Sequence, residues 1–156
     1  MQTSQLTGIK LFNYRNFKKK TLAFSKTHTL LKGKNAVGKT SILEAISFLS
    51  PGNGFKKDLL ENIINSQLVQ EGASINLSFY DEGSEQNLKI IFQFIDSKLS
   101  KSYLLNDKKI TQQALMNFFQ LFWFSELDKV YFIKDKQYQR NTCNRIMCYF
   151  NSELFK

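Results

Sequence analysis

The chain has 156 residues, the length of a single domain, and a hydrophobic content of 42% that is enough to form a core. Its 22 basic and 13 acidic residues give a formal net charge of +9, which favours a polyanionic partner such as nucleic acid. AT-rich coding sequence produces the same excess of Lys, Asn, Ile and Phe without any DNA partner. Charge alone therefore leaves both explanations open.

Three sequence features bear on where the protein works. No apolar run approaches the length of a membrane span, so we expect no membrane partner. The N-terminus carries no apolar signal segment. Cys143 and Cys148 lie five positions apart, a spacing that suits neither a zinc site nor a disulfide within a helix. We therefore expect a reduced, cytoplasmic protein.

The first segment predicts three short strands. Leu6, Ile9 and Leu11 indicate the first strand, which we expect to break at the polar cluster 13–16. The run Lys18–Lys20 is interpreted as a solvated turn, and residues 21–24 as a second strand. Residues 28–32 are predicted to form a third, buried strand.

Residues 33–40 read Gly-Lys-Asn-Ala-Val-Gly-Lys-Thr and match the phosphate-binding loop pattern G-x-x-x-x-G-K-[ST] completely. A helix is predicted from about Thr40 to Leu49, with Ile42, Ala45 and Ile46 on its apolar stripe. Backbone amides at a helix N-terminus bind anions, so this loop predicts a triphosphate site. Lys39 is expected to reach the phosphates, and Thr40 to ligate Mg²⁺.

The next segment alternates apolar and polar residues, which predicts antiparallel strands with one wet face. A short helix is expected over 59–64, followed by strands at 73–80, 88–95 and 102–105. Two acids follow apolar runs as a catalytic, metal-binding acid would: Asp81 and Asp96. Gly83 after the first run favours a hairpin, with Asp81 in its turn. Gln93 within the second run and Lys98 just after it argue against Asp96 as a metal-binding acid.

The remaining chain predicts a helix capped by Thr111, a buried strand at 121–124 and a helix over 136–150. The predicted fold class is α/β: part of an ABC-type, P-loop ATPase head, with a mixed sheet that contains antiparallel strands, plus helices. Residues 1–135 are expected to form the N-terminal part of the head, or lobe I. Residues 136–156 are expected to begin a helical second lobe.

Two segments resemble the RecF family, SMC-like ATPases of bacterial DNA replication and repair. Residues 11–17, Leu-Phe-Asn-Tyr-Arg-Asn-Phe, resemble the Leu-x-Asn-Phe-Arg-Asn-Tyr opening of that family. Residues 31–52 are similar to its loop, helix and trailing Ser-Pro-Gly. Weaker similarity continues through 124–126 and 139–145. The chain resembles the N-terminal portion of such a protein, and the signature motif and Walker B acid of relatives lie beyond the matching part.

The resemblance implies a cytoplasmic protein of DNA replication, recombination, repair and the SOS response. It implies ATP and Mg²⁺ as cofactors, and an ATP-dependent homodimer in full-length members. It also implies DNA, at single-strand/double-strand junctions, and recombination mediator proteins as partners. The expected ATP-binding residues are Gly33, Lys34, Asn35, Ala36, Val37, Gly38, Lys39, Thr40, Ser41 and Arg15. The expected contacts to the DNA backbone are Lys18, Lys19, Lys20, Lys56 and Lys57.

Departures from the family pattern leave other functions open. Ala36 stands where the family has Gly, which is tolerable if φ stays negative there. Asn144 replaces an Asp, and a Pro is missing after Ser125. One alternative is a self-sufficient small P-loop NTPase or kinase. The other is a non-catalytic DNA-binding fragment with a vestigial nucleotide site. Whether the chain hydrolyses ATP, folds alone or dimerises is left open.

Overall fold

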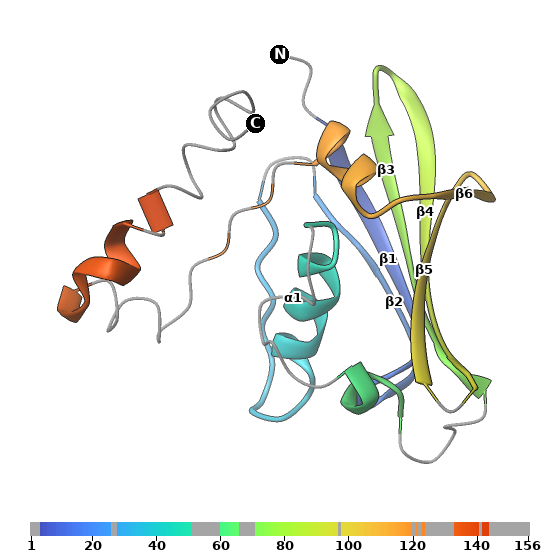
Figure 1. Cartoon of the computed structure of the whole chain (residues 1–156), viewed down its shortest axis with the longest axis horizontal. Helices are drawn as coiled ribbons and strands as arrows, with labels where there is room; N and C mark the ends of the chain where they lie inside the picture. Colours follow the sequence, from blue (N-terminus) through green and yellow to red (C-terminus); the bar gives the residue numbers. More distant parts are fainter. Residues whose placement is uncertain are drawn as a thin grey trace. The chain divides into compact units, whose positions relative to one another are not determined.

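The computed structural model describes residues 4–25, 28–50, 60–65, 71–96, 98–119, 121, 123, 133–140 and 142–143. The chain divides into two compact units, 1–119 and 120–156 (Figure 1). The described residues of the first unit include a sheet, the helix α1 and the 3₁₀ helices η1 and η3, and those of the second include helical turns at 133–134, 136–140 and 142–143. The predicted start of a second lobe at residue 136 stays a prediction.

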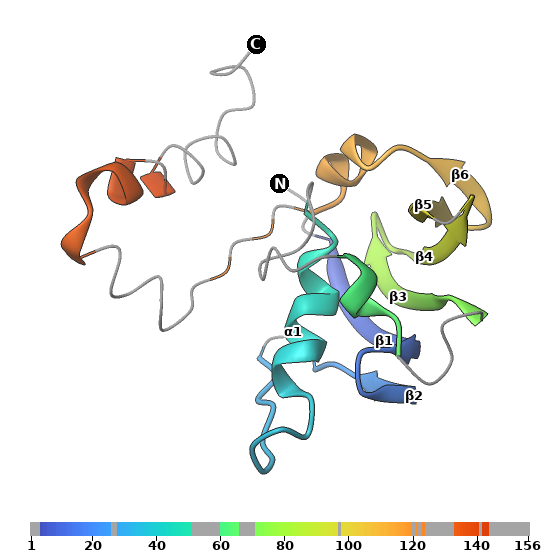
Figure 2. The ribbon, with the colours of Figure 1, turned by 60° about the horizontal axis from the view of Figure 1, so that its bottom comes forward.

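The first unit is built on a six-stranded sheet in the order β2-β1-β3-β4-β5-β6 (Figures 1 and 2). Its strands are β1 (Gln5–Tyr14), β2 (Phe17–Ala23), β3 (Ala73–Asp81), β4 (Ser84–Ile95), β5 (Lys98–Leu105) and β6 (Lys108–Ile110). Every pairing among these strands is antiparallel. The predicted combination of antiparallel strands and helices is confirmed, and the three strands expected after residue 72 are present.

One face of the sheet and helix α1 (Lys39–Ser47) enclose the core (Figure 1). Alternate residues of the strands are buried on this face, as the period of two requires. The rings of Phe48 and Phe92 meet edge to face at 5.3 Å and join the helix end to β4. The fully buried core side chains of the strands include Ile9, Leu11, Tyr14, Ile75, Leu77, Phe79, Leu88, Ile90 and Phe92.

Two predictions about the first segment are wrong. Lys18–Lys20 lie within strand β2, because a two-residue turn at Arg15 and Asn16 starts the strand at Phe17. Polar residues suit this strand because it lies at the sheet edge. Residues 28–32 form no strand and are largely exposed, with Leu30 80% exposed. No described strand pairs with residues 28–32, so they lack the inter-strand backbone hydrogen bonds that a buried strand needs.

The other helices follow the sequence closely. Helix α1 begins one residue earlier and ends two residues earlier than expected. The helix predicted over 59–64 is the 3₁₀ helix η1 (Leu60–Ile63), and Thr111 accepts a hydrogen bond from the amide of Ala114 ahead of η3 (Gln113–Asn117). Residues 122, 124 and 144–150 lie outside the described residues, and the described residues Leu121 and Trp123 are not in a strand. In the described part of the chain, no helix is long and apolar enough to span a membrane.

Candidate nucleotide-binding site

Residues 33–37 are exposed in a loop that leads through the half-buried Gly38 into helix α1. Gly38 is the N-cap residue, with φ of 96°, a backbone conformation that favours glycine. The Lys39 ammonium group folds back over the loop and donates hydrogen bonds of 2.7 Å to the carbonyl oxygens of Gly33 and Lys34. The Lys39 ammonium group therefore lies against the phosphate-binding loop, as the motif predicts.

The N-terminus of α1 fits an anionic ligand. No side chain caps it, and no acidic residue lies in its first turn. The first amide groups of an α-helix have no partner within the helix, and the helix dipole favours negative charge there. A triphosphate would therefore meet backbone donors, the Lys39 ammonium group and the Thr40 hydroxyl, which is of the type that ligates Mg²⁺ beside phosphates. The residues present fit Mg·ATP.

Ala36 corrects one expectation about this loop. Its φ is +64°, whereas we expected a negative value to make the replacement of Gly tolerable. The Cβ atom of an L-residue crowds its carbonyl oxygen in this region, at a cost of about 1–2 kcal/mol. The loop conformation is thus imposed on Ala36 by its surroundings, and the strain is located at the binding site itself.

The turn between β1 and β2 lies against the last glycine of the loop. A Cβ atom at Gly38 would lie 2.3 Å from the Phe17 ring and 2.9 Å from the Asn16 side-chain oxygen. These distances leave no space for a side chain at position 38. The turn that carries Arg15 and Asn16 therefore supports the loop from one side, although the two segments are separated by about twenty residues in sequence.

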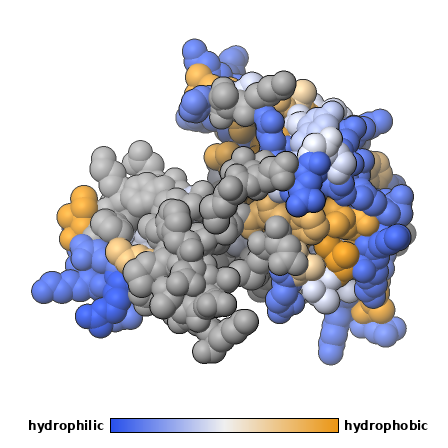
Figure 3. All heavy atoms as spheres, turned by 90° about the horizontal axis from the view of Figure 1, so that it is seen from above, coloured by the Kyte–Doolittle hydropathy of each residue, from blue (hydrophilic) through white to orange (hydrophobic). Residues whose placement is uncertain are grey.

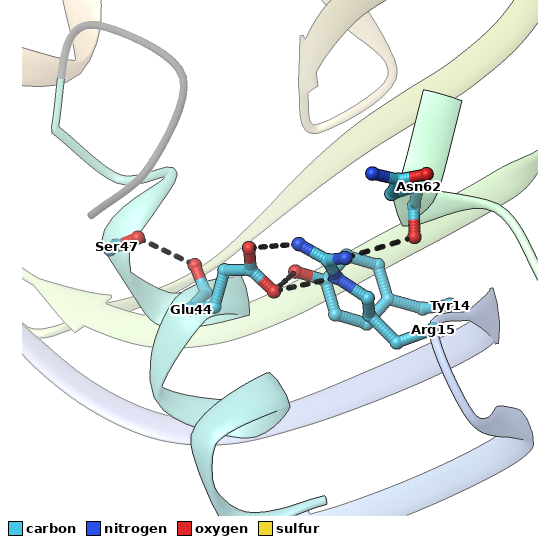
Figure 4. A network of polar contacts seen from close by, with 5 residues as sticks. All are labelled: Tyr14, Arg15, Glu44, Ser47 and Asn62. Carbon is cyan, nitrogen blue, oxygen red and sulfur yellow. Dashed lines mark hydrogen bonds and ion pairs between the residues drawn. The ribbon is translucent and has the colours of Figure 1, made fainter. Parts of the chain in front are cut away.

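Arg15 is held by a network that joins this turn to α1 and η1 (Figure 4). Its guanidinium group forms a two-point ion pair with Glu44, in which the Nε–Oε2 distance is 2.9 Å. Its Nη1 atom donates a hydrogen bond of 3.1 Å to the carbonyl oxygen of Asn62. The backbone amide of Arg15 donates one of 2.6 Å to the carbonyl oxygen of Ile63. The φ of Arg15 is +54°, so these contacts hold a strained residue in place.

Glu44 is the centre of this network and is 1% exposed. Its Oε2 atom also accepts a hydrogen bond of 3.1 Å from the buried Tyr14 hydroxyl. Burial, and after it the Glu44 carboxylate, raise the pKa of Tyr14 far above its ordinary value. Tyr14 therefore remains a hydroxyl donor over the whole physiological range. The role of Arg15 at the phosphates stays a prediction, because its guanidinium group is directed at Glu44 and Asn62.

Several predicted residues lie away from the loop. Asp81 ends β3 in a hairpin and accepts a hydrogen bond of 2.6 Å from Ser4, and Asp96 lies in the β4–β5 turn with φ of 49°. This placement confirms the interpretation of Asp81 as a hairpin residue, and it also puts Asp96 in a turn. Lys18, Lys19 and Lys20 are exposed on β2, whereas Lys56 and Lys57 lie outside the described residues. Their role as DNA contacts stays a prediction.

Sequence reasoning missed Glu44, Tyr14, Asn16 and Phe17 as parts of the site. One available signal was the position of Glu44 within an otherwise apolar helix surface. A buried carboxylate requires a partner of opposite charge. Arg15 is the one arginine that precedes the loop in the sequence, so it was the candidate for that partner.

A complete phosphate-binding loop at the start of a helix that packs on the sheet places the chain among the P-loop nucleotide-binding proteins. The chain belongs to the RecF/RecN/SMC N-terminal domain family, whose model matches residues 5–127. It is 29% identical over 151 residues to the DNA replication and repair protein RecF of Rickettsia canadensis (strain McKiel). That match covers 97% of this chain and 41% of the relative. The RecF protein of Protochlamydia amoebophila (strain UWE25) is 36% identical over 94 residues, 60% of this chain and 26% of its own length.

Solved structures show the same fold. The recombination mediator protein RecF-ATPrS in the RecFOR pathway superimposes with a TM-score of 0.80 and 23% identity, covering 99% of this chain and 41% of that chain. The SMC head domain from Thermotoga maritima gives a TM-score of 0.55 with 22% identity, covering 72% and 41%. The chain thus spans about two fifths of the length of these relatives.

Proposed function

We propose that this chain is the ATP-binding N-terminal part of a RecF-type protein of DNA replication and recombinational repair. It binds Mg·ATP at residues 33–41, with Lys39 on the phosphates and Thr40 on the metal. It acts in the cytoplasm on DNA at single-strand/double-strand junctions, with recombination mediator proteins and a second copy of the full-length protein as partners. The observation that carries the proposal is the complete loop at the uncapped N-terminus of α1, in a chain that matches RecF along 97% of its length.

We predict that Lys39→Ala weakens Mg·ATP binding roughly 10- to 150-fold. A charge-assisted hydrogen bond contributes about 1.5–3 kcal/mol, and Lys39 offers such bonds to the phosphates. In the free protein, Lys39 donates instead to the Gly33 and Lys34 carbonyl oxygens, so the net gain is lower than for a free ammonium group. Isothermal calorimetry with Mg·ATP measures the change.

Lys32→Ala is the matched control for this experiment. It removes the same charge from an exposed position one residue ahead of the loop and should leave the affinity unchanged. Circular dichroism should show that both variants are folded. Equal affinities for wild type and Lys39→Ala would refute the assignment of the phosphate site.

We expect the chain to bind ATP without measurable turnover, with or without DNA. Hydrolysis requires an acid that positions Mg²⁺ and water, in addition to the loop. Asp81 and Asp96 lie in hairpin turns, and the described residues contain no group of three or more His, Cys, Asp or Glu side chains that could hold a metal. Steady-state phosphate release, with Lys39→Ala as the background, provides the measurement.

The same assay tests the alternative of a self-sufficient small NTPase. Turnover of about 1 per second or faster, in the range typical of kinases, would favour that alternative. It would have to be abolished both by Lys39→Ala and by Asp81→Asn. A protein that bound DNA but no nucleotide would instead be the non-catalytic fragment with a vestigial site.

A further inference from the structure

The face of the sheet away from α1 carries a row of residues in register across all six strands, and three of these residues are lysines. Residues in direct cross-strand register share a face of the sheet. The pairings place one residue of each strand in this row: Thr21, Lys10, Asn76, Lys89, Leu104 and Lys109. All three lysines are exposed. Hydrophilic residues line the right-hand edge of the view in Figure 3, the side of the sheet away from α1. We call this row the lysine row.

A hollow of about 520 Å³ lies at the centre of the lysine row. Lys10 and Lys89 flank Asn76 there, and the hydroxyl of Ser78 contacts the side-chain oxygen of Asn87 at 3.0 Å. The Asn76 side-chain oxygen is buried and has no hydrogen-bond partner among the described residues. One carboxylate, that of Asp107, also lines the hollow. Buried polar atoms in proteins are normally partnered, and a carbonyl oxygen can only accept, so this one requires a donor such as a water molecule or a lysine ammonium group.

The spacing of the lysine row suits a polymer of negative charges. Neighbouring strands lie about 4.8 Å apart, so Lys10 and Lys89 are about 10 Å apart at the backbone, and so are Lys89 and Lys109. A single small anion would use only the two lysines at the hollow. A nucleic-acid backbone presents a phosphate at each nucleotide and can contact all three.

An exposed aromatic ring on the same face favours a single strand over a duplex. Phe12 is 43% exposed, lies two residues from Lys10 on β1 and is in register with Lys19 and Ser74. Aromatic side chains stack on unpaired bases, and this contact is independent of sequence. The bases of a duplex are already stacked on each other, so Phe12 would have no such role there.

We propose that the lysine row and Phe12 form a binding surface for single-stranded nucleic acid. Lys10, Lys89 and Lys109 contact the phosphates, and Phe12 stacks on a base. This inference rests on the proposed DNA binding and moves its main site from the lysines of the edge strand β2 to the open face of the sheet.

The test is fluorescence anisotropy with an oligothymidylate of about 16 nucleotides, the upper end of the site size of single-strand-binding folds. The variant Lys10→Gln/Lys89→Gln/Lys109→Gln should lower the slope of log affinity against log salt by about 2, because each phosphate contact on a single strand contributes about 0.7. The control Lys32→Gln/Lys108→Gln/Lys134→Gln removes the same charge from exposed lysines outside the row. It should keep the wild-type slope.

A second pair of variants tests the stacking contact. Phe12→Ala should weaken binding of the single strand by roughly 5- to 150-fold, the equivalent of about 1–3 kcal/mol per stacked base, and leave duplex binding unchanged. Phe94→Ala is the matched control, because Phe94 is 40% exposed but follows the register of the core-facing residues of β4. It should have no effect. Thermal unfolding should show that all variants remain folded.

The outcomes separate this inference from the proposed function. The inference would be overturned, with DNA binding left in place, if Lys18→Gln/Lys19→Gln/Lys20→Gln lowered the slope of log affinity against log salt. The variant Lys10→Gln/Lys89→Gln/Lys109→Gln would then keep the wild-type slope. Binding of inorganic phosphate without binding of the oligonucleotide would make the hollow a free-anion site and also overturn it. Tighter binding of a duplex, insensitive to Phe12→Ala, would contradict the choice of a single strand. No binding of any nucleic acid at low salt would remove the DNA partner from the proposed function as well.

Discussion

Glu44→Gln is expected to lower the free energy of unfolding by about 3 kcal/mol. Removal of one partner from a buried ion pair leaves the other charge without compensation, at a typical cost of about 3–5 kcal/mol. The lower value applies because the Arg15 side chain is 14% exposed, whereas that of Glu44 is only 2% exposed. The substitution also removes the charge that the buried Tyr14 hydroxyl faces. Urea denaturation of both proteins measures the difference.

Two controls identify the cause of this loss. Glu85→Gln makes the same chemical change at an exposed position and should shift stability by about 0.5 kcal/mol or less. The double variant Arg15→Gln/Glu44→Gln should be more stable than the sum of the single changes implies, since neither charge is then left unpaired. A loss below about 1 kcal/mol in Glu44→Gln would show that the pair does not hold the turn to the helix.

The phosphate loop and its helix could be predicted because their chemistry is local. Gly38, Lys39 and Thr40 are required by the loop itself, and the apolar stripe of α1 repeats within a few residues. The alternation over 73–80 likewise predicts β3 and the turn position of Asp81. In each case, the residues that determine the structure lie next to one another in the sequence.

The features that sequence reasoning missed depend on distant partners. The Glu44 carboxylate is buried because Arg15, 29 positions earlier, neutralises it. The sequence Lys18–Lys20 is typical of a turn. The lysines lie on an edge strand because the chain already turns at Arg15 and Asn16. The positive φ of Ala36 is likewise invisible in a motif that tolerates any residue at that position.

Gly38→Ala should have an effect of similar size to Glu44→Gln, because two penalties combine at Gly38. We expect a loss of stability of about 2–5 kcal/mol. About 1–2 kcal/mol comes from placing an L-residue in the left-handed region, and about 1–3 kcal/mol from overpacking. The backbone term applies because φ is 96°, and the packing term because the new Cβ atom would lie 2.3 Å from the Phe17 ring.

Urea denaturation measures the stability of Gly38→Ala, and calorimetry with Mg·ATP measures its ATP affinity. Because the displaced loop also begins α1, ATP affinity should fall together with stability.

Gly83→Ala separates the two penalties. Gly83 has φ of 79°, and nothing lies within 4 Å of the position that a Cβ atom would take. This variant therefore carries the backbone cost alone and should lose about 1–2 kcal/mol without any change in ATP affinity. The double variant Phe17→Ala/Gly38→Ala removes the ring that blocks the new methyl group, so it should recover part of the ATP affinity although it loses the packing of Phe17. If Gly38→Ala destabilises the protein no more than Gly83→Ala does and binds ATP normally, then the β1–β2 turn does not support the phosphate loop.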